Sequence, residues 1–374
     1  MSRASTRLLM VPMLARHALR GAPAEPPRRI LIAHQLLLGD TLMLAPLLAK
    51  LRAQYPAAEI VMLCPPAILP LFAAHPYGVT ALPYAERHSA TLKALWPQRG
   101  FDLALIPAEN RMAWLARALG SRRIVAFGGD DKGYKNWLVD RCRPWPTTPT
   151  ALPDIFATLV DGAAPASFQP TDWPWAAAAP FAAPTAPYAV LHVGASNRLR
   201  YWEPARWTAL AGWLAAQGIQ PVWSAGAKEV EQVALADPAG TYASYGGKLD
   251  LLQLAHLLKG ARLLVSPDTG VAHLARLTGT PALTLYGPGS PVLFGPGDFW
   301  RHAPLAAITV DIECRDQRTL FRRELDWVRR CGRGFGDGPN QCPRARCMEG
   351  LALDAVTASC RQLLADTGGI RVSI

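Results

Sequence analysis

Strand-length apolar runs alternate with helical segments twice along this chain, and this alternation constrains the fold more than any other feature. In the first half, "RRILIAH", "EIVMLCP", "FDLALIP" and "RRIVAF" have the length and composition of buried strands. After Tyr188 the pattern restarts with "YAVLHVG", "IQPVWSAG", "ARLLV" and "PALTLYG". Such alternation indicates parallel sheets with helices on both faces. We therefore predict an α/β fold with two doubly wound domains that face a cleft.

The two halves also set the predicted domain boundaries. With 374 residues, the chain is long enough for two full cores. The region between the halves is rich in proline and alanine, which is typical of a semi-rigid linker. We predict a basic N-terminal arm (1–28), a first domain (29–165), a linker (166–187), a second domain (188–350) with an Arg/Cys-rich segment (311–347), and a C-terminal helix and tail (351–374).

The net charge of +11 indicates an acidic partner, such as a phosphorylated substrate, nucleic acid or an anionic membrane surface. Residues 1–30 hold six Arg against one Glu, and residues 315–346 hold nine Arg against four acids. Neither region interleaves aromatic residues regularly with the basic ones, and the chain has no helix-turn-helix, zinc-finger or RNA-binding signature. These observations disfavour nucleic acid as the partner.

The N-terminal sequence and the cysteines indicate where in the cell the protein is found. No window reaches the 18 or so apolar residues of a membrane-spanning helix. Pro12 and Arg16 interrupt the apolar part of "RLLMVPMLARHALRGAPAEPPRR", so we predict a disordered or membrane-surface arm rather than a signal peptide. Seven cysteines without regular spacing favour a reducing compartment, and hence the cytoplasm.

The stretch Leu263–Pro288, "LLVSPDTGVAHLARLTGTPALTLYGP", reads as strand, tight loop, helix and strand. In an open parallel sheet such a loop lies at the carboxyl edge, where ligands bind. The N–H groups that begin the helix would suit a phosphate. The alternative is that Asp268 or Thr269 only caps the helix and that Gly270 only permits the turn.

The loop after the first strand is "QLLLGDT". The chain has neither a G-x-G-x-x-G after that strand nor a G-x-x-x-x-G-K-[ST], which disfavours a dinucleotide dehydrogenase or a P-loop enzyme. Gly39 can adopt a backbone shape that other residues resist, and Asp40 then begins a predicted helix over 41–54. Asp40 is either an N-cap or a carboxylate in the cleft that accepts a proton from a hydroxyl.

Three segments together resemble one family. "GDTLMLAPLLAKLRAQYP", "HVGASNRLRYWEPARWTAL" and "SPDTGVAHLARLTGTPALTLYGP" are similar to the family-nine glycosyltransferases, the bacterial heptosyltransferases of the lipopolysaccharide inner core. The resemblance implies a GT-B fold of two Rossmann-like domains, with the acceptor bound by the first and the donor by the second. It also implies metal-independent, inverting transfer of heptose from ADP-heptose to a lipid-linked glycan, at the cytoplasmic face of the inner membrane. No cofactor is expected.

The resemblance assigns two catalytic roles. Asp40 would be the general base that deprotonates the acceptor hydroxyl. Arg200 would stabilise the charge on the departing diphosphate, because "RYW" places it where the family usually has a lysine. Arg198 could substitute for Arg200, and the alternative for either is an exposed loop arginine.

Further residues are assigned to the donor. Glu229 or Glu231 would accept hydrogen bonds from ribose hydroxyls, or either would simply favour the start of a helix. His273 would face the donor or be a packed core histidine, and Asp268 would orient the loop and a sugar hydroxyl. The full set of predicted donor-binding residues is Ser196, Arg198, Glu229, Asp268, Thr269, Gly270, Val271, His273 and Gly287.

The predicted acceptor loop departs from the family. Relatives commonly have Arg and small polar residues before Gly-Asp, whereas this chain has His34, Gln35 and the apolar run 36–38 ahead of Gly39. The sequence therefore leaves the identity of the acceptor open. The alternatives to a lipopolysaccharide-core glycan are a protein side-chain hydroxyl, as in heptosylation of autotransporters, or a non-catalytic scaffold that binds the nucleotide-sugar.

Cysteines gather near the C-terminus, at Cys314, Cys331, Cys342 and Cys347. Four thiolates can form a tetrahedral zinc or iron site, and the branch of the family that modifies autotransporters binds iron through C-terminal cysteines. The spacing lacks a C-x-x-C pair, which favours reduced cysteines in a loop over a metal. The arginines of the same segment would meet lipid phosphates at the membrane or form a solvated basic face.

Overall fold

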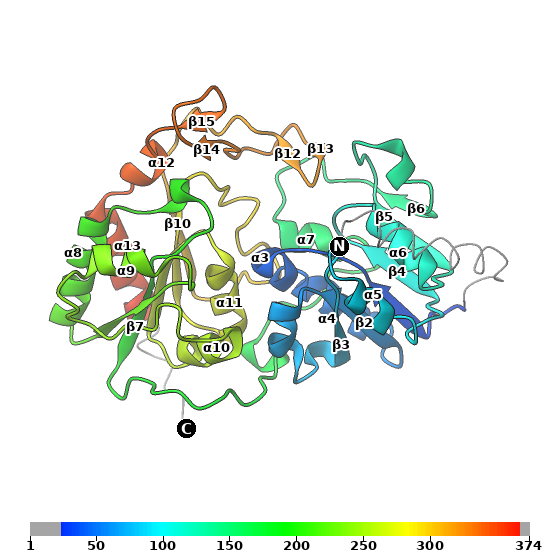
Figure 1. Cartoon of the computed structure of the whole chain (residues 1–374), viewed down its shortest axis with the longest axis horizontal. Helices are drawn as coiled ribbons and strands as arrows, with labels where there is room; N and C mark the ends of the chain where they lie inside the picture. Colours follow the sequence, from blue (N-terminus) through cyan, green and yellow to red (C-terminus); the bar gives the residue numbers. More distant parts are fainter. Residues whose placement is uncertain (1–23, 367–374) are drawn as a thin grey trace. The chain divides into compact units, whose positions relative to one another are not determined.

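The computed structural model describes residues 24–366, which form two compact units. Within that range, unit 1 comprises the residues up to Ser167 together with Thr171–Ala176 and Thr319–Trp327. Unit 2 comprises Phe168–Pro170, Ala177–Arg318 and the residues from Val328 onward. Each unit contains a parallel sheet with helices packed on it, which confirms the predicted fold class (Figure 1). Most of the predicted N-terminal arm and the end of the C-terminal tail lie outside the described residues.

Unit 1 is built on a six-stranded parallel sheet with the order β3-β2-β1-β4-β5-β6. The chain therefore reverses its direction of travel across the sheet between β1 and β4, and the carboxyl edge at such a point is where ligands bind in open α/β sheets. The strands are β1 Arg29–Ile32, β2 Glu59–Cys64, β3 Val79–Pro83, β4 Leu103–Ile106, β5 Arg123–Phe127 and β6 Arg141–Arg143.

Five α-helices surround this sheet within the described residues. The predicted helix over 41–54 is wrong in extent, because the structure has two helices there, α3 before residue 43 and α4 after residue 44. Pro46 lies in the first turn of α4 and has no N–H to continue the ladder of α3, which accounts for the break. The helices are α3 Leu38–Leu42, α4 Ala45–Gln54, α5 Ser89–Ala94, α6 Met112–Ala118 and α7 Leu152–Ala157.

Residues Thr319–Trp327 belong to unit 1, although the sequence places them in the predicted second domain. Strands β12 (Thr319–Leu320) and β13 (Arg323–Glu324) pair as a short antiparallel hairpin, which we call the 319–327 hairpin. The reason for its placement is Arg323, which is 2% exposed and donates hydrogen bonds to backbone and side-chain oxygens of unit 1. A buried guanidinium needs such partners, so it fixes the segment there.

Unit 2 contains a five-stranded parallel sheet with the order β11-β10-β9-β7-β8. Its direction reverses between β9 and β7, which again marks a carboxyl edge suited to a ligand. The strands are β7 Tyr188–His192, β8 Gln220–Ser224, β9 Leu263–Pro267, β10 Ala282–Tyr286 and β11 Leu305–Thr309. The principal helices are α8 Pro204–Ala216, α9 Val230–Ala236, α10 Leu251–Lys259, α11 Gly270–Thr278, α12 Arg346–Glu349 and α13 Leu353–Asp366.

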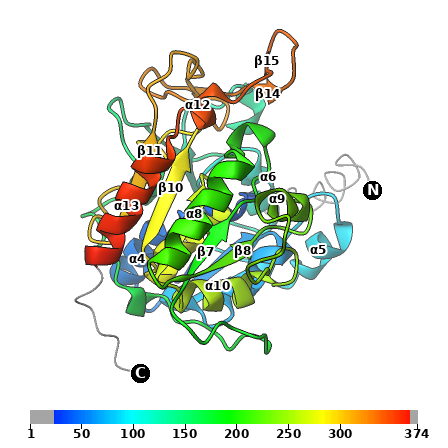
Figure 2. The same cartoon turned by 90° about the vertical axis from the view of Figure 1, so that its left-hand side faces the viewer.

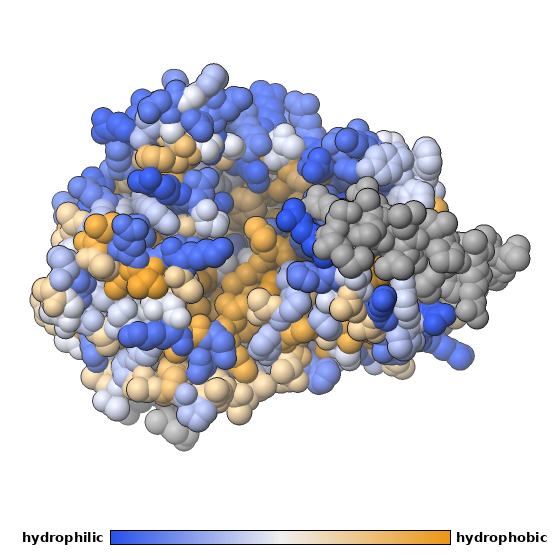
Figure 3. All heavy atoms as spheres, in the orientation of Figure 1, coloured by the Kyte–Doolittle hydropathy of each residue, from blue (hydrophilic) through white to orange (hydrophobic). Residues whose placement is uncertain are grey.

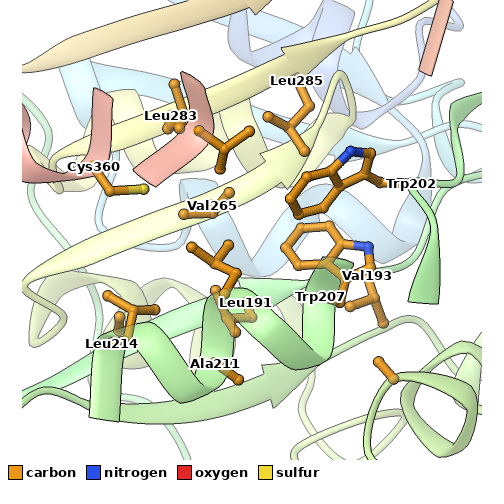
Figure 4. Packing of buried hydrophobic residues seen from close by; sticks show 14 of the residues in the cluster. Leu191, Val193, Trp202, Trp207, Ala211, Leu214, Val265, Leu283, Leu285 and Cys360 are labelled. Atoms are coloured by element: carbon orange, nitrogen blue, oxygen red, sulfur yellow. The ribbon is translucent and has the colours of Figure 1, made fainter. Parts of the chain in front are cut away.

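Helices α8 and α13 pack side by side on one face of this sheet (Figure 2). The core beneath them joins strand residues such as Leu191 and Val265 to Cys360 of α13 (Figure 4). Trp202 and Trp207 meet edge to face, with ring centroids 5.1 Å apart, and both are almost fully buried. Burial of this apolar surface holds the carboxyl edge of β7 and β9 rigid.

The predicted linker is tied to both units by aromatic side chains. Phe168 lies in unit 2, with its ring centroid 5.8 Å from that of Phe299. Trp173 is 1% exposed in unit 1, and its ring centroid is 5.2 Å from that of Phe72. The segment therefore packs within each unit as well as joining them. Among residues 24–366, no helix is both long enough and apolar enough to cross a membrane.

Candidate active site

Unit 1 has a cavity of about 180 Å³ at the carboxyl edge of its sheet. Asp40 and the residues just before it line the cavity from the loop after β1, and Glu109 and Arg111 line it from the loop after β4. These loops meet because β1 and β4 are adjacent parallel strands. Phe321, at the tip of the 319–327 hairpin, completes the lining. The cavity therefore collects residues from three distant parts of the sequence.

Asp40 is half-buried in the first turn of α3. It is not the N-cap, because α3 begins at Leu38 and Leu37 occupies the cap position without a side-chain hydrogen bond. The structure thus contradicts the capping alternative for Asp40. Gly39 is helical and does not have the positive φ that would require glycine, so the special backbone shape predicted for it is wrong. The carboxylate of Asp40 remains as a cavity group.

His34 is buried beside Asp40 and is 1% exposed. Its Nδ1 accepts a hydrogen bond from the backbone N–H of Leu36 at 3.2 Å, so the proton of the neutral ring lies on Nε2. Nε2 is buried and has no hydrogen-bond partner among the described residues. Burial lowers the pKa of His34 to about 3, which keeps the ring neutral near pH 7. The cavity therefore has a neutral N–H donor ready for a polar ligand.

Sequence reasoning missed Glu109, Arg111 and Phe321. Arg111 makes ion pairs with Glu86 at 2.5 Å and with Glu109 at 2.7 Å. Glu109 and Arg111 closely follow the predicted strand "FDLALIP", so the rule that ligands bind at carboxyl ends of parallel strands could have identified them. Phe321 had no such signal, because its place depends on where the hairpin docks.

In unit 2, the loop between β9 and α11 brings together most of the predicted donor residues. Thr269 is the N-cap of α11, yet its side chain makes no capping hydrogen bond and its Oγ1 is buried without a partner among the described residues. Gly270 and Val271 open the helix, where the first N–H groups have no partners within the helix. The capping-only alternative is therefore wrong for Thr269. A hydroxyl and a helix N-terminus are available to an anion.

Asp268 lies at the centre of this loop and is 4% exposed. Arg200 donates a hydrogen bond to the carbonyl oxygen of Asp268 at 2.5 Å, and its guanidinium is 3.9 Å from the carboxylate. Nε2 of His273 is 4.0 Å from the same carboxylate, while Nδ1 is buried without a partner among residues 24–366. A side chain on Gly289 would collide with Asp268, since a Cβ there would lie 2.2 Å from Oδ2. The loop is thus closely packed around Asp268.

Burial and neighbouring arginines set the charges here. Burial raises the pKa of Asp268, and Arg200 and Arg276 oppose that rise. Burial, together with the same two arginines, lowers the pKa of His273 well below its usual value. His273 is therefore neutral near pH 7 and presents a polar nitrogen rather than a charge. Arg200, whose side chain is 30% exposed, is one cation beside the start of α11, and the positive charge of Arg330 also acts on Asp268.

The structure distinguishes Glu229 from Glu231. The carboxylate of Glu229 lies against the backbone at Gly226 and Gly194, since a Cβ at those positions would be 2.2 and 3.1 Å from its Oε2. These glycines follow β8 and β7, which places Glu229 at the carboxyl edge of the sheet. Glu231 is exposed in the first turn of α9. Glu229, which also occupies the N-cap position of α9 without a capping hydrogen bond from its side chain, lies at this edge, and its contact with a ribose stays a prediction.

Three other predicted donor residues lie at the same edge. Ser196 and Arg198 are exposed in the loop after β7, and the Arg198 guanidinium lies 4.2 Å from the ring centroid of Phe335. Gly287 follows β10, and its carbonyl oxygen accepts a hydrogen bond from Nε of Arg315 at 2.9 Å. The carbonyl of Gly287 is therefore already occupied, whereas Ser196 and Arg198 face solvent.

We compared the chain with models of known protein families. The family model "Glycosyltransferase family 9 (heptosyltransferase)" matches residues 90–315, which is more than half of the chain. The chain belongs to glycosyltransferase family 9. The resemblance read from the sequence is thereby confirmed.

Curated relatives of this family 9 protein are lipopolysaccharide heptosyltransferases. The protein "Lipopolysaccharide heptosyltransferase 1" of Salmonella typhimurium is 34% identical over 111 residues, covering 29% of this chain and 35% of that protein. Its namesake in Escherichia coli K12 is 35% identical over 109 residues, covering 29% of this chain and 34% of that protein. The match thus spans about a third of the length of these relatives.

Solved structures extend the likeness of the fold across the family 9 chain. "E. coli heptosyltransferase WaaC with ADP" has a TM-score of 0.66 and 19% identity, covering 90% of this chain and 99% of that chain. The iron-containing dodecameric glycosyltransferase TibC from enterotoxigenic E. coli has a TM-score of 0.56 and 14% identity, covering 91% of this chain and 77% of that chain. At these identities the comparison shows the shared fold.

The four C-terminal cysteines of the family 9 protein line one cavity of about 460 Å³ in unit 2. Cys331 Sγ accepts a hydrogen bond from Arg333 at 3.8 Å, and Cys342 Sγ donates one to the carbonyl oxygen of Arg344 at 2.7 Å. No three His, Cys, Asp or Glu side chains between residues 24 and 366 are arranged to hold a metal ion. Hydrophilic residues dominate the surface that carries β14 (Gly334–Phe335) and β15 (Gln341–Cys342) in this view (Figure 3).

Because His34 and His192 are buried, we predict that acid destabilises the fold. Burial lowers the pKa of His34 to about 3 and that of His192 to about 4, from 6.5 in the unfolded chain. The unfolded chain therefore binds protons as the pH falls below 6.5 while the folded protein does not, so stability is full above pH 6.5 and declines toward pH 4. We expect a loss of roughly 2 kcal/mol per histidine between pH 6.5 and 5. Urea unfolding at several pH values measures this slope.

A matched pair of variants shows which histidine causes the dependence of stability on pH. His192→Asn keeps a polar partner for Ser224, whose Oγ lies 3.1 Å from Nδ1 of His192, and should flatten the dependence on pH. His88→Asn, at an exposed histidine, should leave the slope unchanged. Equal slopes in wild type and His192→Asn would contradict this explanation.

Proposed function

We propose that this protein is an inverting glycosyltransferase that moves heptose from ADP-heptose to a hydroxyl of a lipopolysaccharide-core or related glycan. Membership of family 9 supports the reaction class, and the curated relatives support the sugar and the acceptor class. The observation that carries the proposal is the cavity in unit 1, which is lined by the Asp40 carboxylate and by His34, whose Nε2–H has no partner among residues 24–366. A proton acceptor and a neutral donor together suit the activation of a hydroxyl group.

On the acceptor side, Asp40 takes the proton from the hydroxyl as its oxygen attacks the anomeric carbon. His34 donates a hydrogen bond from Nε2 to an acceptor oxygen, which fixes the orientation of the acceptor. The low pKa of His34 means that it stays a neutral donor and does not compete as the base. A single positioned carboxylate suffices, because the leaving group is an already ionised diphosphate that needs no proton.

On the donor side, the departing ADP needs stabilisation of its charge. The N–H groups at Gly270 and Val271, the hydroxyl of Thr269 and the guanidinium of Arg200 lie at the start of α11. Pre-positioned dipoles and a cation at this point stabilise the charge as it develops. His273 adds a neutral hydrogen-bonding nitrogen. Glu229 accepts hydrogen bonds from the ribose hydroxyls at the edge of β7 and β8.

The protein needs no catalytic metal in this proposal, so chelation should not change its turnover. The charge of the leaving diphosphate is met by Arg200 and helix dipoles rather than by a divalent cation. We expect kcat to stay within about twofold when EDTA is added to protein assayed with ADP-heptose and a lipid-linked core acceptor. Mass spectrometry should show one heptose added per acceptor. Loss of turnover in EDTA, restored by Mg²⁺ or Mn²⁺, would contradict the proposal.

The proposed place of action is the cytoplasmic face of the inner membrane, where a lipid-linked acceptor would be found. The basic segment 315–346 supports peripheral contact through its exposed arginines, such as Arg322 and Arg344, whose side chains are 53% and 74% exposed, because anionic lipid attracts such charges. Arg323 of the same segment is buried and does not contribute.

A protein side-chain hydroxyl is the second candidate acceptor, which the sequence resemblance to the autotransporter-modifying branch of the family leaves open. TibC, an iron-containing heptosyltransferase by the titles of its structures, shares the fold of this chain. The four cysteines share one cavity, yet their arrangement does not fit an iron ion, because no three ligand side chains are gathered closely enough among the described residues. We therefore derive no step from iron. Mass spectrometry of products formed from peptide and from glycan acceptors separates the two candidates.

A further inference from the structure

The tip of the 319–327 hairpin is unusual in its backbone. Phe321 and Arg322 form a two-residue turn between β12 and β13, with φ angles of 44° and 65°. Turns that need positive φ at both positions usually contain Asn-Gly or Asp-Gly, because larger side chains clash with the backbone there. Strained residues persist where the surrounding structure fixes them, and they cluster at functional sites. We therefore expect the two side chains at this tip to have a function beyond closing the turn.

Arg323 holds the hairpin firmly in unit 1. Its guanidinium donates to the carbonyl oxygen of Gly128 at 2.7 Å and to Oδ1 of Asn110 at 2.7 Å. It also lies 5.3 Å from the ring centroid of Trp145. At the other end of the segment, Nε1 of Trp327 donates to the carbonyl oxygen of Pro146 at 2.8 Å. These contacts fix the tip relative to the sheet of unit 1 rather than leaving it a loose loop.

Phe321 uses that fixed position to form part of the cavity that contains Asp40. It is half-buried, and its ring stacks on the buried ring of Phe156, with centroids 6.1 Å apart and planes 27° apart. The stacking sets the plane of the Phe321 ring. An aromatic ring of fixed orientation beside a proposed base resembles the apolar wall of a ligand pocket.

The charges of the cavity restrict its ligand. Asp40 and Glu109 contribute carboxylates. Arg111, the cation among the described lining residues, is paired with Glu109 and Glu86 at 2.7 and 2.5 Å. Glu109 also lies 3.8 Å from Nε of Arg322, so the charges of Glu86 and Glu109 are balanced by Arg111 and Arg322, and Asp40 adds a further negative charge. An anionic ligand would meet this negative charge in a confined site, where like charges repel. A neutral ligand with hydroxyl groups suits the site instead.

We propose that Phe321 is the platform on which a neutral pyranose ring of the acceptor stacks, so that one of its hydroxyls reaches Asp40. The C–H face of a pyranose is apolar and matches an aromatic ring, while its hydroxyls match His34 and Glu109. The 319–327 hairpin thereby selects the acceptor. This inference rests on the proposed function, since it takes the cavity of Asp40 as the acceptor site.

Steady-state kinetics with the full chain tests the platform. Phe321→Ala should raise the KM for the lipid-linked core acceptor about tenfold and leave the KM for ADP-heptose unchanged. Phe321→Tyr keeps the ring and should stay within about twofold of wild type. Glu324→Ala, an exposed change on β13 of the same hairpin, is the control and should match wild type. A purely structural role would instead lower the thermal midpoint and kcat in Phe321→Ala without a selective change in acceptor KM.

Binding without turnover separates this inference from the proposed function. With wild type and no ADP-heptose, so that no turnover occurs and Asp40 keeps its charge, ligand-observed NMR should detect roughly millimolar binding of methyl glucoside and at least about fivefold weaker binding of the charged methyl glucuronide. Glucoside binding should be lost in Phe321→Ala. Undiminished glucoside binding in Phe321→Ala, equal binding of the two sugars, or no glucoside binding at all would overturn the platform. Failure of the proposed function would appear elsewhere, as the absence of acceptor-dependent ADP release in wild type.

Discussion

Replacing Asp40 with Asn lowers kcat about 10³-fold and leaves the dissociation constant for ADP-heptose within about twofold of wild type. The amide keeps the size of the side chain but cannot accept the proton from the acceptor hydroxyl, so only the chemical step suffers. Asp40 lies in unit 1, while the proposed donor residues are in unit 2, so the affinity for the donor should persist. Single-turnover assays and calorimetry with ADP-heptose measure the two quantities.

Glu109 supplies the matched control for that experiment, because it is a second carboxylate of the same cavity. Glu109→Gln removes one negative charge but not the proposed base, so it should lower kcat less than about tenfold. If Glu109→Gln were the more damaging change, the role of base would pass from Asp40 to Glu109. Comparable small losses in both variants would remove the base assignment altogether.

Replacing Arg200 with Ala lowers kcat about 10²-fold, the second largest effect that we expect. Arg200 is the partly buried cation beside the start of α11, hydrogen-bonded to the carbonyl oxygen of Asp268. Its loss removes the cation that is hydrogen-bonded to this loop and leaves the departing diphosphate with the helix dipoles and the neighbouring arginines, such as Arg330. Arg200→Lys keeps the charge but not the forked geometry, so it should recover only part of the activity. Rapid-quench measurement of ADP formation reports this step.

Arg198 is the natural control for Arg200, because it lies two residues earlier in the same loop. It is exposed and stacks on Phe335, so Arg198→Ala should change kcat less than about threefold. Greater loss in Arg198→Ala than in Arg200→Ala would transfer the cation role to Arg198. Thermal midpoints of both variants show whether either change acts through folding instead.

The sequence was sufficient to predict the two parallel sheets and eight of their strands, because each of these strands is a local apolar run. The edge strands β3, β6 and β11 were missed; β6, for example, is the polar stretch Arg141–Arg143 and is ordered by its pairing with β5. The sequence was also sufficient to place Asp40 and Asp268 in loops that follow strands at the carboxyl edge of each sheet, and the binding of ligands by these loops stays a prediction. The interruption after α3 was missed, although Pro46 carried the signal. That signal was outweighed by the helical spacing around it.

Other parts of the site depend on tertiary contacts that no local pattern contains. The 319–327 hairpin belongs to unit 1 because of Arg323, whose partners lie about two hundred residues earlier in the chain. Glu229 is separated from Glu231 only by the close approach of its carboxylate to Gly194 and Gly226. Such choices follow from packing in three dimensions, so the sequence left them open.

The most direct test of the central claim is the release of ADP from ADP-heptose by wild type and Asp40→Asn, each with and without a lipid-linked core acceptor. We predict release by wild type that depends on the acceptor, and loss of that release in Asp40→Asn despite normal ADP binding. Release that ignores the acceptor, release that survives the Asp40→Asn change, or no binding of ADP at all would contradict the claim that this family 9 protein is a transferase with Asp40 as its base.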